Sequence, residues 1–223
     1  MRLPSFRISL TTLCLLMLHL TAPTAQASVI GIGVGAFGPG STLTTFTGLA
    51  NGLEVNGLIT DGILFNYSLG NGRLVIDGGP GTTNNVQPQN IVSAPGGNAG
   101  ILTLTFPSSI SSFGYGYAVL TTFSVANATT IDLFSGTTNV GSLSHNALPD
   151  PLFAGGFAGI QSTIPFNSAR VTFNSTVGPA FAMDNIRTAG AIGVPEPSTF
   201  VLLVIGIGLL WPCRRTIKGG CSQ

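Results

Sequence analysis

Few residues in the central part of this 223-residue chain have the chemistry that catalysis needs. His145 and Asp150 lie close together in one short segment, and a histidine beside a carboxylate can act as a general base. A serine nucleophile would also need a strained turn of the Gly-x-Ser-x-Gly type, and the sequence contains none. The pattern therefore favours a loop histidine in solvent over a catalytic one.

Two aspartates form the other candidate pair. Hydrolysis of a glycosidic bond requires two carboxylates that face each other across the bond. Asp132 and Asp184 meet this requirement only if their strands are adjacent. The glycine-rich string from Gly33 to Gly38 matches the dinucleotide-binding fingerprint by letter, but no strand and helix follow it in the required order. We therefore expect no catalytic residue and no enzymatic activity.

A structural metal site is the remaining candidate. Hard cations such as Ca²⁺ bind carboxylates, amide oxygens and backbone carbonyls. Asp184 and Asn185 supply one acid–amide pair, and Glu54 or Asp61 would supply an early carboxylate, so that Ca²⁺ would tie the last strand to the first loops. The alternative is that Asp184 is an ordinary turn-capping carboxylate. Zinc is disfavoured because the central region has no cysteine and a single histidine, and no other cofactor is expected.

The C-terminal segment carries a motif of another kind. Pro195-Glu196-Pro197 is followed by an uncharged apolar run from Phe200 to Trp211 and then by Arg214, Arg215 and Lys218. Counted with its flanks, the run approaches the ~20 residues that a membrane-spanning helix needs. The basic residues would remain cytoplasmic, and the two prolines would keep the glutamate in extended backbone outside the membrane. We therefore predict a short membrane anchor that follows an accessible recognition box.

This order of box, apolar run and basic cluster over residues 195–218 resembles a PEP-CTERM sorting signal. The resemblance implies that an exosortase, an integral-membrane cysteine protease, recognises Pro195, Glu196 and Pro197 and releases the exported domain to the cell surface or matrix. Before release, the helix 200–211 would hold the chain in the inner membrane, with the cluster 214–218 as its cytoplasmic stop. A plain anchor that is never cleaved is the alternative.

The N-terminal segment has the features of a secretory signal peptide. Arg2 and Arg7 precede an apolar stretch from Ile8 to Leu20. Ala25 and Ala27 then form the small-residue pattern that signal peptidase cleaves. Residues 1–27 are therefore predicted to be removed on export.

The region between the two signals is sparsely charged. Residues 28–194 contain three arginines, six acidic residues and no lysine, a formal charge of −3. So few cations exclude nucleic acid as a partner. All three cysteines lie outside this region, so it has no disulfide and must gain its stability from burial. Its length is that of one domain, which we place at residues 28–187, with a linker at 188–194.

Hydrophobic residues in this domain alternate with small or polar ones, which is the period of β-strands with one buried face. Asn-Gly and Asp-Gly dipeptides between the runs predict tight turns, namely residues 51–52, 56–57, 61–62, 71–72 and 77–78. The pattern predicts strands near 41–48, 62–69, 72–77, 100–106, 112–125, 129–135, 138–143, 152–160, 169–174 and 180–187. This number of short strands favours an all-β, antiparallel, jelly-roll-like β-sandwich. We expect an inward-facing set that consists of Phe106, Tyr115, Val119, Leu133, Phe173 and Phe181.

The polar stretch from Asp77 to Gly100 interrupts this pattern. It is rich in glycine, proline, asparagine and glutamine, and is therefore expected to be a mobile loop over one end of the sandwich. The order of the strands around it resembles, loosely, the β-rich domains that often precede this sorting signal. That resemblance implies no particular activity.

Three classes of function follow. The first is a non-enzymatic structural or adhesive component of the cell surface, matrix or biofilm, associated with extracellular polysaccharide. Its candidates for stacking on sugar rings are Tyr115 and Tyr117, although core positions are favoured for both. The second is a carbohydrate-binding module in the strict sense, which requires exposed aromatic residues in a groove. The third, a secreted hydrolase, has the least support in the sequence.

Overall fold

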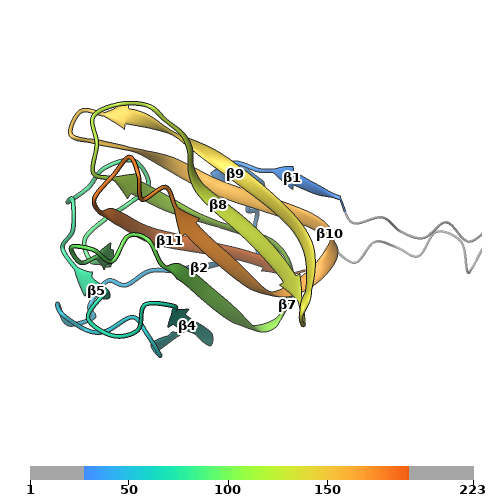
Figure 1. Ribbon diagram of the computed structural model, residues 1–223. Coiled ribbons are helices and arrows are strands. Elements are labelled where there is room, and N and C mark those ends of the chain that lie inside the picture. Colours follow the sequence, from blue (N-terminus) through green and yellow to red (C-terminus); the bar gives the residue numbers. More distant parts are fainter. Residues whose placement is uncertain (1–27, 191–223) are drawn as a thin grey trace, which may run out of the picture.

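The computed structural model describes residues 28–190, which form an all-β structure in which every strand pairing is antiparallel (Figure 1). The all-β prediction is therefore confirmed for this part of the chain. One short 3-10 turn, η2 (Val34–Ala36), accompanies the strands. The strands are β1 (Val29–Gly31), β2 (Thr42–Thr44), β3 (Ile59–Thr60), β4 (Ile63–Tyr67), β5 (Leu74–Asp77), β6 (Asn90–Ser93), β7 (Ile101–Val119), β8 (Val125–Ser135), β9 (Thr138–Asp150), β10 (Phe153–Phe173) and β11 (Phe181–Gly190).

The strands belong to one continuous sheet of 11 strands whose main order is β5-β6-β11-β7-β10-β8-β9. β1 pairs with β10, β2 pairs with β11, and β4 pairs with β3 and β7. The two longest strands, β7 and β10, pair with each other along both halves, and their register shifts between Gln161 and Ser168. The first half of β7 also pairs with β4, whereas its second half pairs with β11.

Ring contacts show that this sheet folds over on itself. Phe173, near the end of β10, pairs in register with Thr129 of β8. Its ring nevertheless stacks on Phe181 of β11 at 3.8 Å between centroids and lies 6.3 Å from the ring of Tyr115 on β7. Two layers are thus packed face to face through a shared core. The separate sheets expected of a jelly roll are replaced by one sheet that bends along its two longest strands.

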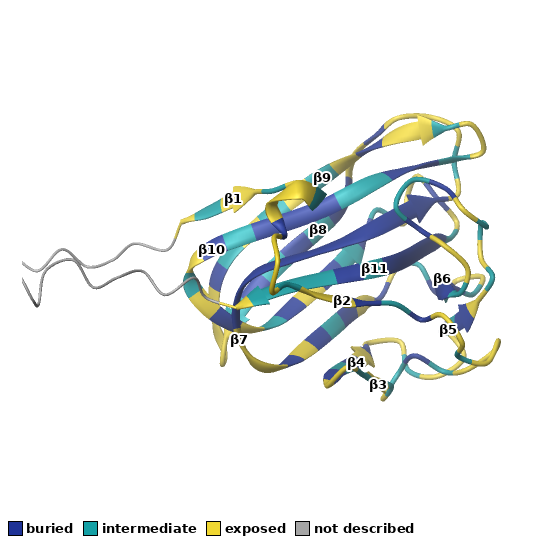
Figure 2. Cartoon of the chain, turned by 180° about the vertical axis from the view of Figure 1, so that it is seen from behind, coloured by how far each residue is buried: buried dark blue, intermediate teal, exposed yellow. Residues whose placement is uncertain are grey.

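The core between the layers contains the whole predicted inward-facing set. Phe106, Tyr115, Val119, Leu133, Phe173 and Phe181 are all buried. Two tyrosines also hydrogen-bond across the core: the Tyr115 hydroxyl lies 2.5 Å from Thr129 Oγ1, and the Tyr117 hydroxyl donates to the carbonyl of Asn146 at 2.8 Å. Figure 2 shows burial concentrated along the central strands, with exposed residues at hairpin ends and edge strands. Both tyrosines are therefore core residues and offer no surface for sugar stacking.

The stretch from Asp77 to Gly100 differs from the prediction of a mobile loop. It contains β6, which pairs with both β5 and β11. Val86 and Asn90 within it are fully buried. At its far end the Tyr67 hydroxyl donates to the carbonyl of Gly97 and accepts from the amide of Gly100. The segment is fixed by packing and hydrogen bonds that its glycine- and asparagine-rich composition conceals.

Turn geometry follows the predicted dipeptides at most positions. Gly52, Gly57, Gly62 and Gly72 all have positive φ. At the fifth turn the positive φ falls on Gly79 instead of Gly78. The strand boundaries differ more, because the predicted strands 152–160 and 169–174 are parts of the single strand β10.

The two ends of the sheet differ in what they carry: one carries both termini of the described region, and the other carries loops. Val29 pairs with Ser162, and Gly190 pairs with Ile110, so both termini of the described region leave from the same end (right in Figure 1). At the opposite end, Val119 pairs with both Ala154 and Phe181. This second end, formed by the loops 120–124, 151–152 and 174–180, is called the free end below.

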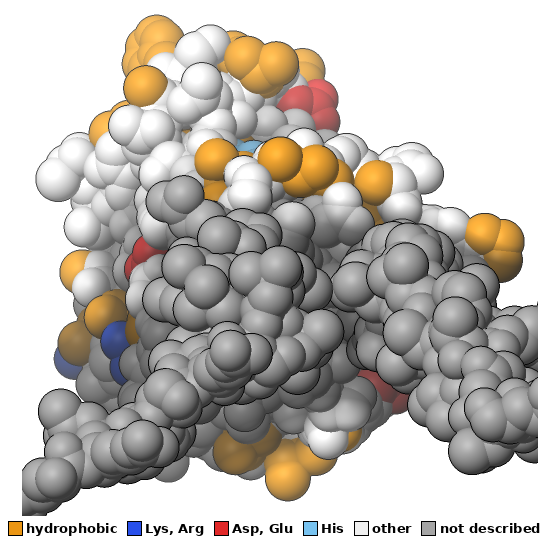
Figure 3. All heavy atoms as spheres, turned by 90° about the vertical axis from the view of Figure 1, so that its right-hand side faces the viewer, with side chains coloured by type: hydrophobic (Ala, Val, Ile, Leu, Met, Phe, Trp, Pro, Cys, Tyr) orange, Lys and Arg blue, Asp and Glu red, His pale blue; other side chains and the backbone are white. Residues whose placement is uncertain are grey.

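The terminus-proximal side of the molecule is seen in Figure 3. Its uncovered parts carry small groups of hydrophobic side chains and few charged ones, as the sparse charge of the sequence predicts. The predicted signal peptide (1–27), residues 191–194 of the predicted linker, and the predicted sorting box, anchor and basic cluster (195–218) lie outside the described residues. The first residues of the predicted linker, 188–190, belong instead to β11. Among residues 28–190, no helix has the length and apolar character to cross a membrane.

Candidate functional site

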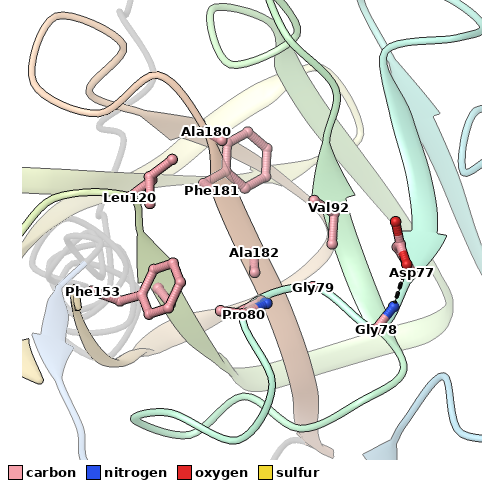
Figure 4. Close-up of a pocket in the computed structure, with 11 residues that line it drawn as sticks. Asp77, Gly78, Gly79, Pro80, Val92, Leu120, Phe153, Ala180, Phe181 and Ala182 are labelled. Carbon is pink, nitrogen blue, oxygen red and sulfur yellow. Dashed lines mark hydrogen bonds between the residues drawn. The ribbon is translucent and has the colours of Figure 1, made fainter. Parts of the chain in front are cut away.

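A pocket of about 420 Å³ opens at the free end, on the outer face of the layer that contains β6, β11 and β7 (Figure 4). Its volume falls within the range of small-molecule sites. The pocket is lined by Asp77, Gly78, Gly79, Pro80, Val92, Ala118, Leu120, Phe153, Ala180, Phe181 and Ala182.

Small side chains create the hollow. Val92 of β6 pairs with Ala182 of β11, which pairs with Ala118 of β7, which pairs with Gly155 of β10. These residues form one row across four strands. The two alanines line the pocket and also pack against the buried side chain of Val86. Gly155 lies outside the pocket, because the Asn84 side chain approaches the sheet closely at that position. The floor of the pocket is therefore paired β-strand backbone that carries short apolar groups.

Phe153 provides the aromatic wall of the pocket. This residue begins β10, and its side chain is half-buried. Phe181 also lines the pocket, but its ring stacks on Phe173 inside the core. In Figure 4 the Phe153 ring and Leu120 lie on one side of the pocket and Val92 on the other. Phe153 is thus the aromatic residue of the lining whose ring is not part of the stacked pair in the core.

The opposite rim is polar. Asp77 ends β5 and is exposed, and its Oδ1 accepts a hydrogen bond of 2.6 Å from the amide of Gly78. The backbone from Gly78 to Pro80 continues along the rim, as Figure 4 shows. A carboxylate and peptide groups opposite one aromatic ring form a mixed site, which combines apolar contact with a few hydrogen bonds.

The segment that continues from this rim, residues 78–89, is here called the cover segment. It lies on the outer face of the sheet, where a Cβ atom at Gly116 would be only 2.0 Å from the Asn85 carbonyl oxygen. Asp150 Oδ2 accepts hydrogen bonds from the Thr83 hydroxyl at 2.8 Å and from the Asn84 amide at 2.9 Å. These hydrogen bonds lower the pKa of the Asp150 carboxyl. The cover segment is therefore held against the sheet by a carboxylate from the β9–β10 hairpin.

Asp184 holds the same segment from below. It lies within β11, is 2% exposed, and accepts a hydrogen bond of 3.0 Å at Oδ2 from the Gln87 amide. Burial raises the pKa of its carboxyl to about 6. The neighbouring Asn185 donates through Nδ2 to the Asn85 carbonyl at 2.8 Å. The two residues predicted as metal ligands thus contact the cover segment.

The early carboxylates predicted to complete a metal site lie elsewhere. Glu54 bridges to Val75 on the edge strand β5 and accepts from the Gly72 amide at 2.8 Å. Asp61 lines a hollow with Thr188 and Gly190 at the terminus-proximal end. Neither is a hydrogen-bonding neighbour of Asp184. Residues 28–190 contain no group of three or more His, Cys, Asp or Glu side chains arranged to hold a metal.

The structure separates both candidate catalytic pairs. Asp132 lies on β8, which pairs with β9 and β10, whereas Asp184 lies on β11 beside β6 and β7. The two strands are not adjacent, so these carboxylates do not face each other. His145 lies within β9 and is half-buried, which corrects the expected solvent loop, and burial lowers its pKa. Asp150 binds the cover segment instead of this histidine.

Sequence reasoning missed the pocket for identifiable reasons. Phe153 stands in a glycine- and alanine-rich run whose alternation is weak. The contributions of Asp77 and of the glycines after it depend on the course of the cover segment, which their turn-like composition does not reveal. The sequence offered one signal. Small residues alternate with large ones in these strands, so that one face of the sheet carries only small side chains, and another segment of the chain can approach that face closely.

Comparison with known proteins leaves the family open. No protein-family model matches the sequence, and no curated protein matches it. Two solved variants of a family 29 carbohydrate-binding module, each 10% identical in sequence, have TM-scores of 0.34 and 0.35 and cover 71% and 70% of this chain and 99% of their own. A third variant, 12% identical with a TM-score of 0.29, covers 77% of this chain and 99% of its own. Similarity at this level carries no argument about the ligand.

Proposed function

We propose that this chain is an exported, non-catalytic binding module that holds a short stretch of neutral extracellular polysaccharide in the free-end pocket. The observation that carries the proposal is the placement of the Phe153 ring and the polar rim at Asp77 on either side of one apolar pocket floor. Sugar rings have an apolar face suited to an aromatic ring and hydroxyl edges suited to a carboxylate and peptide groups.

The sparse charge supports a neutral ligand. Three arginines and no lysine in residues 28–194 cannot neutralise a densely anionic chain. The position of the pocket supports a surface role, since both termini leave from the opposite end and a polymer at the free end would not collide with a membrane-attached linker. Separation of Asp132 from Asp184 supports binding without hydrolysis.

Delivery follows from the terminal motifs. The signal peptide would direct export, and the Pro195-Glu196-Pro197 box with its apolar run and basic cluster supports sorting by an exosortase. The domain would be anchored briefly in the inner membrane and then transferred to the cell surface or matrix. Signal peptidase and exosortase are its processing partners in this proposal.

A second candidate is a structural or adhesive matrix component without a defined sugar site. The buried tyrosines favour it, because Tyr67, Tyr115 and Tyr117 are all in the core. The most exposed aromatic ring among residues 28–190 is that of Phe123, which is 74% exposed on the loop between β7 and β8. A protein of this kind would associate with polysaccharide through scattered contacts and not through one pocket.

Retention on insoluble neutral polysaccharides separates the two candidates. The full-length protein, purified in detergent, is mixed with a panel of such polymers together with its Asp77→Asn and Asp132→Asn variants. Specific binding predicts retention that falls for Asp77→Asn and is unchanged for Asp132→Asn, whose side chain lies on β8 away from the pocket. Equal retention of all three proteins would favour the adhesive role, and release of reducing sugar from any polymer would contradict the absence of catalysis.

A further inference from the structure

Two buried oxygen atoms beneath the cover segment have no hydrogen-bond partner among the described residues. They are Oδ1 of Asp184, which is 2% exposed, and Oδ1 of Asn90, which is 0% exposed. A buried acceptor that is left unpaired destabilises the folded state, and a charged acceptor does so more strongly. Two such atoms therefore require an explanation.

The two side chains are neighbours. β11 and β6 pair through Ala182 with Val92 and Met183 with Ile91, and the same register sets Asp184 beside Asn90 one step further along. Both also contact Gln87: its amide donates to Asp184 Oδ2 at 3.0 Å, and its carbonyl accepts from Asn90 Nδ2 at 3.0 Å. The unpaired oxygens thus belong to side chains that meet at a single residue of the cover segment.

The chemistry of this pair is that of an oxygen-ligand site for a cation. Both free atoms are acceptors, one from a carboxylate and one from an amide, and the carbonyls of Asn85 and Gln87 lie in the same turn of chain. Among the described residues, the groups that interact with the Asp184 carboxyl are the backbone amides of Asn185 and Gln87, and neither is positively charged. Carboxylate, asparagine and backbone oxygens are the ligands that Ca²⁺ prefers.

We propose that Asp184 and Asn90 bind Ca²⁺, which fastens the cover segment to β6 and β11. This site differs from the one expected from sequence, because the second side chain is Asn90 and not an early carboxylate. The ion is structural: it binds the folded state and holds the segment whose first residues form the pocket rim. The proposal does not depend on the ligand of the pocket.

Thermal unfolding of the full-length protein in detergent, with CaCl2 or with a calcium chelator, tests the site. A Ca²⁺ concentration one hundred times the Kd should raise the wild-type Tm by about 5–10 °C. Asp184→Asn should abolish this rise. Asn90→Asp should enlarge it, because a second carboxylate replaces the amide. Asp132→Asn, on the other layer, should retain the wild-type rise.

Three results would overturn the proposal. Identical wild-type midpoints in calcium and chelator would mean that a water molecule and not a cation satisfies the two oxygens. A rise that persists in Asp184→Asn would place the ion elsewhere. Loss of the rise in Asp61→Asn combined with its retention in Asn90→Asp would assign the site to the early carboxylate.

Discussion

Oδ2 of Asp150 accepts a hydrogen bond of 2.8 Å from the hydroxyl of Thr83, which joins positions 67 residues apart in the sequence. This contact fixes the cover segment to the β9–β10 hairpin at the free end. The hydrogen bond from Gln87 to Asp184 fixes the same segment to β11. A polar stretch without long strands of its own is thereby held in one position, and the pocket rim at Asp77 to Pro80 depends on that position.

The buried carboxyl of Asp184 predicts a pH dependence of stability. Its pKa in the folded protein is raised to about 6 from 3.8, so the folded state binds more protons than the unfolded state between these values. The corresponding stabilisation is present in full below about pH 4 and is lost as the pH rises through 6. In chelator above pH 7, Asp184→Asn should therefore be more stable than wild type by roughly 1–3 kcal/mol.

Urea unfolding of both proteins at pH 4, 6 and 8 measures this difference. Other titrating groups, including His145, contribute equally to both proteins and cancel. A difference in the free energy of unfolding that is the same at all three pH values would show that Asp184 does not titrate in this range.

Stacking of Phe173 on Phe181 predicts that removal of one of these rings will lower the stability of the fold strongly. Their rings lie 3.8 Å apart with planes inclined by 13°, and they join the two layers of the folded sheet. Phe173→Ala should lower the free energy of unfolding by about 3–5 kcal/mol through lost burial and the cavity that remains. The matched control is Phe123→Ala, since Phe123 is 74% exposed and its loss should cost less than about 0.5 kcal/mol. Chemical denaturation that gives equal costs for the two variants would contradict the assigned core.

The close approach of the cover segment to Gly116 predicts how a substitution at this position would disturb the segment. A methyl group at this position would meet the Asn85 carbonyl, so Gly116→Ala must push the segment away from the sheet at a cost of about 1–3 kcal/mol. Gly35→Ala is the control, because nothing lies within 4 Å of a Cβ atom there. Hydrogen exchange of residues 78–89 should become faster in Gly116→Ala alone. Unchanged exchange would mean that the segment is not held by this contact.

The two layers and their core could be predicted because alternation was strong in the longest strands. The large side chains of β7 repeat every second residue, and this pattern predicted the burial of Tyr115 and Val119 correctly. β6 was not predicted, because its short run from Asn90 to Ser93 is surrounded by residues typical of turns. Local composition indicates only the conformation that a segment prefers by itself, whereas β6 is stabilised by pairing with β5 and β11.

The candidate site depended still more on long-range contacts. Asp184 was predicted as a ligand from its type and its position on the last strand, and the structure places it beneath the cover segment. Its neighbour Asn90 could not be chosen from sequence, since the register of β11 against β6 brings together positions far apart in the chain. The bend in β7 and β10 likewise determines which strands face each other across the core. The alternation of hydrophobic residues does not predict this bend.

The terminal motifs predict the processing of the chain. If an exosortase cleaves near Pro195-Glu196-Pro197, mass spectrometry of the cell-surface fraction should find the chain beginning at Ser28 and lacking peptides beyond Ser198. Substitution of Glu196 by Ala should leave the protein in the membrane fraction. Recovery of the peptide Thr216 to Lys218 from surface material would instead support an anchor that is never cleaved.

Isothermal titration of the full-length protein with neutral oligosaccharides tests the proposed function most directly. The wild-type protein should bind at least one such ligand. Phe153→Ala should weaken that binding about tenfold, equivalent to ~1.4 kcal/mol, while Phe123→Ala, which removes an exposed ring outside the pocket, should leave the affinity unchanged. Absence of binding to every neutral oligosaccharide, or equal affinities of the two variants, would contradict a polysaccharide site at Phe153.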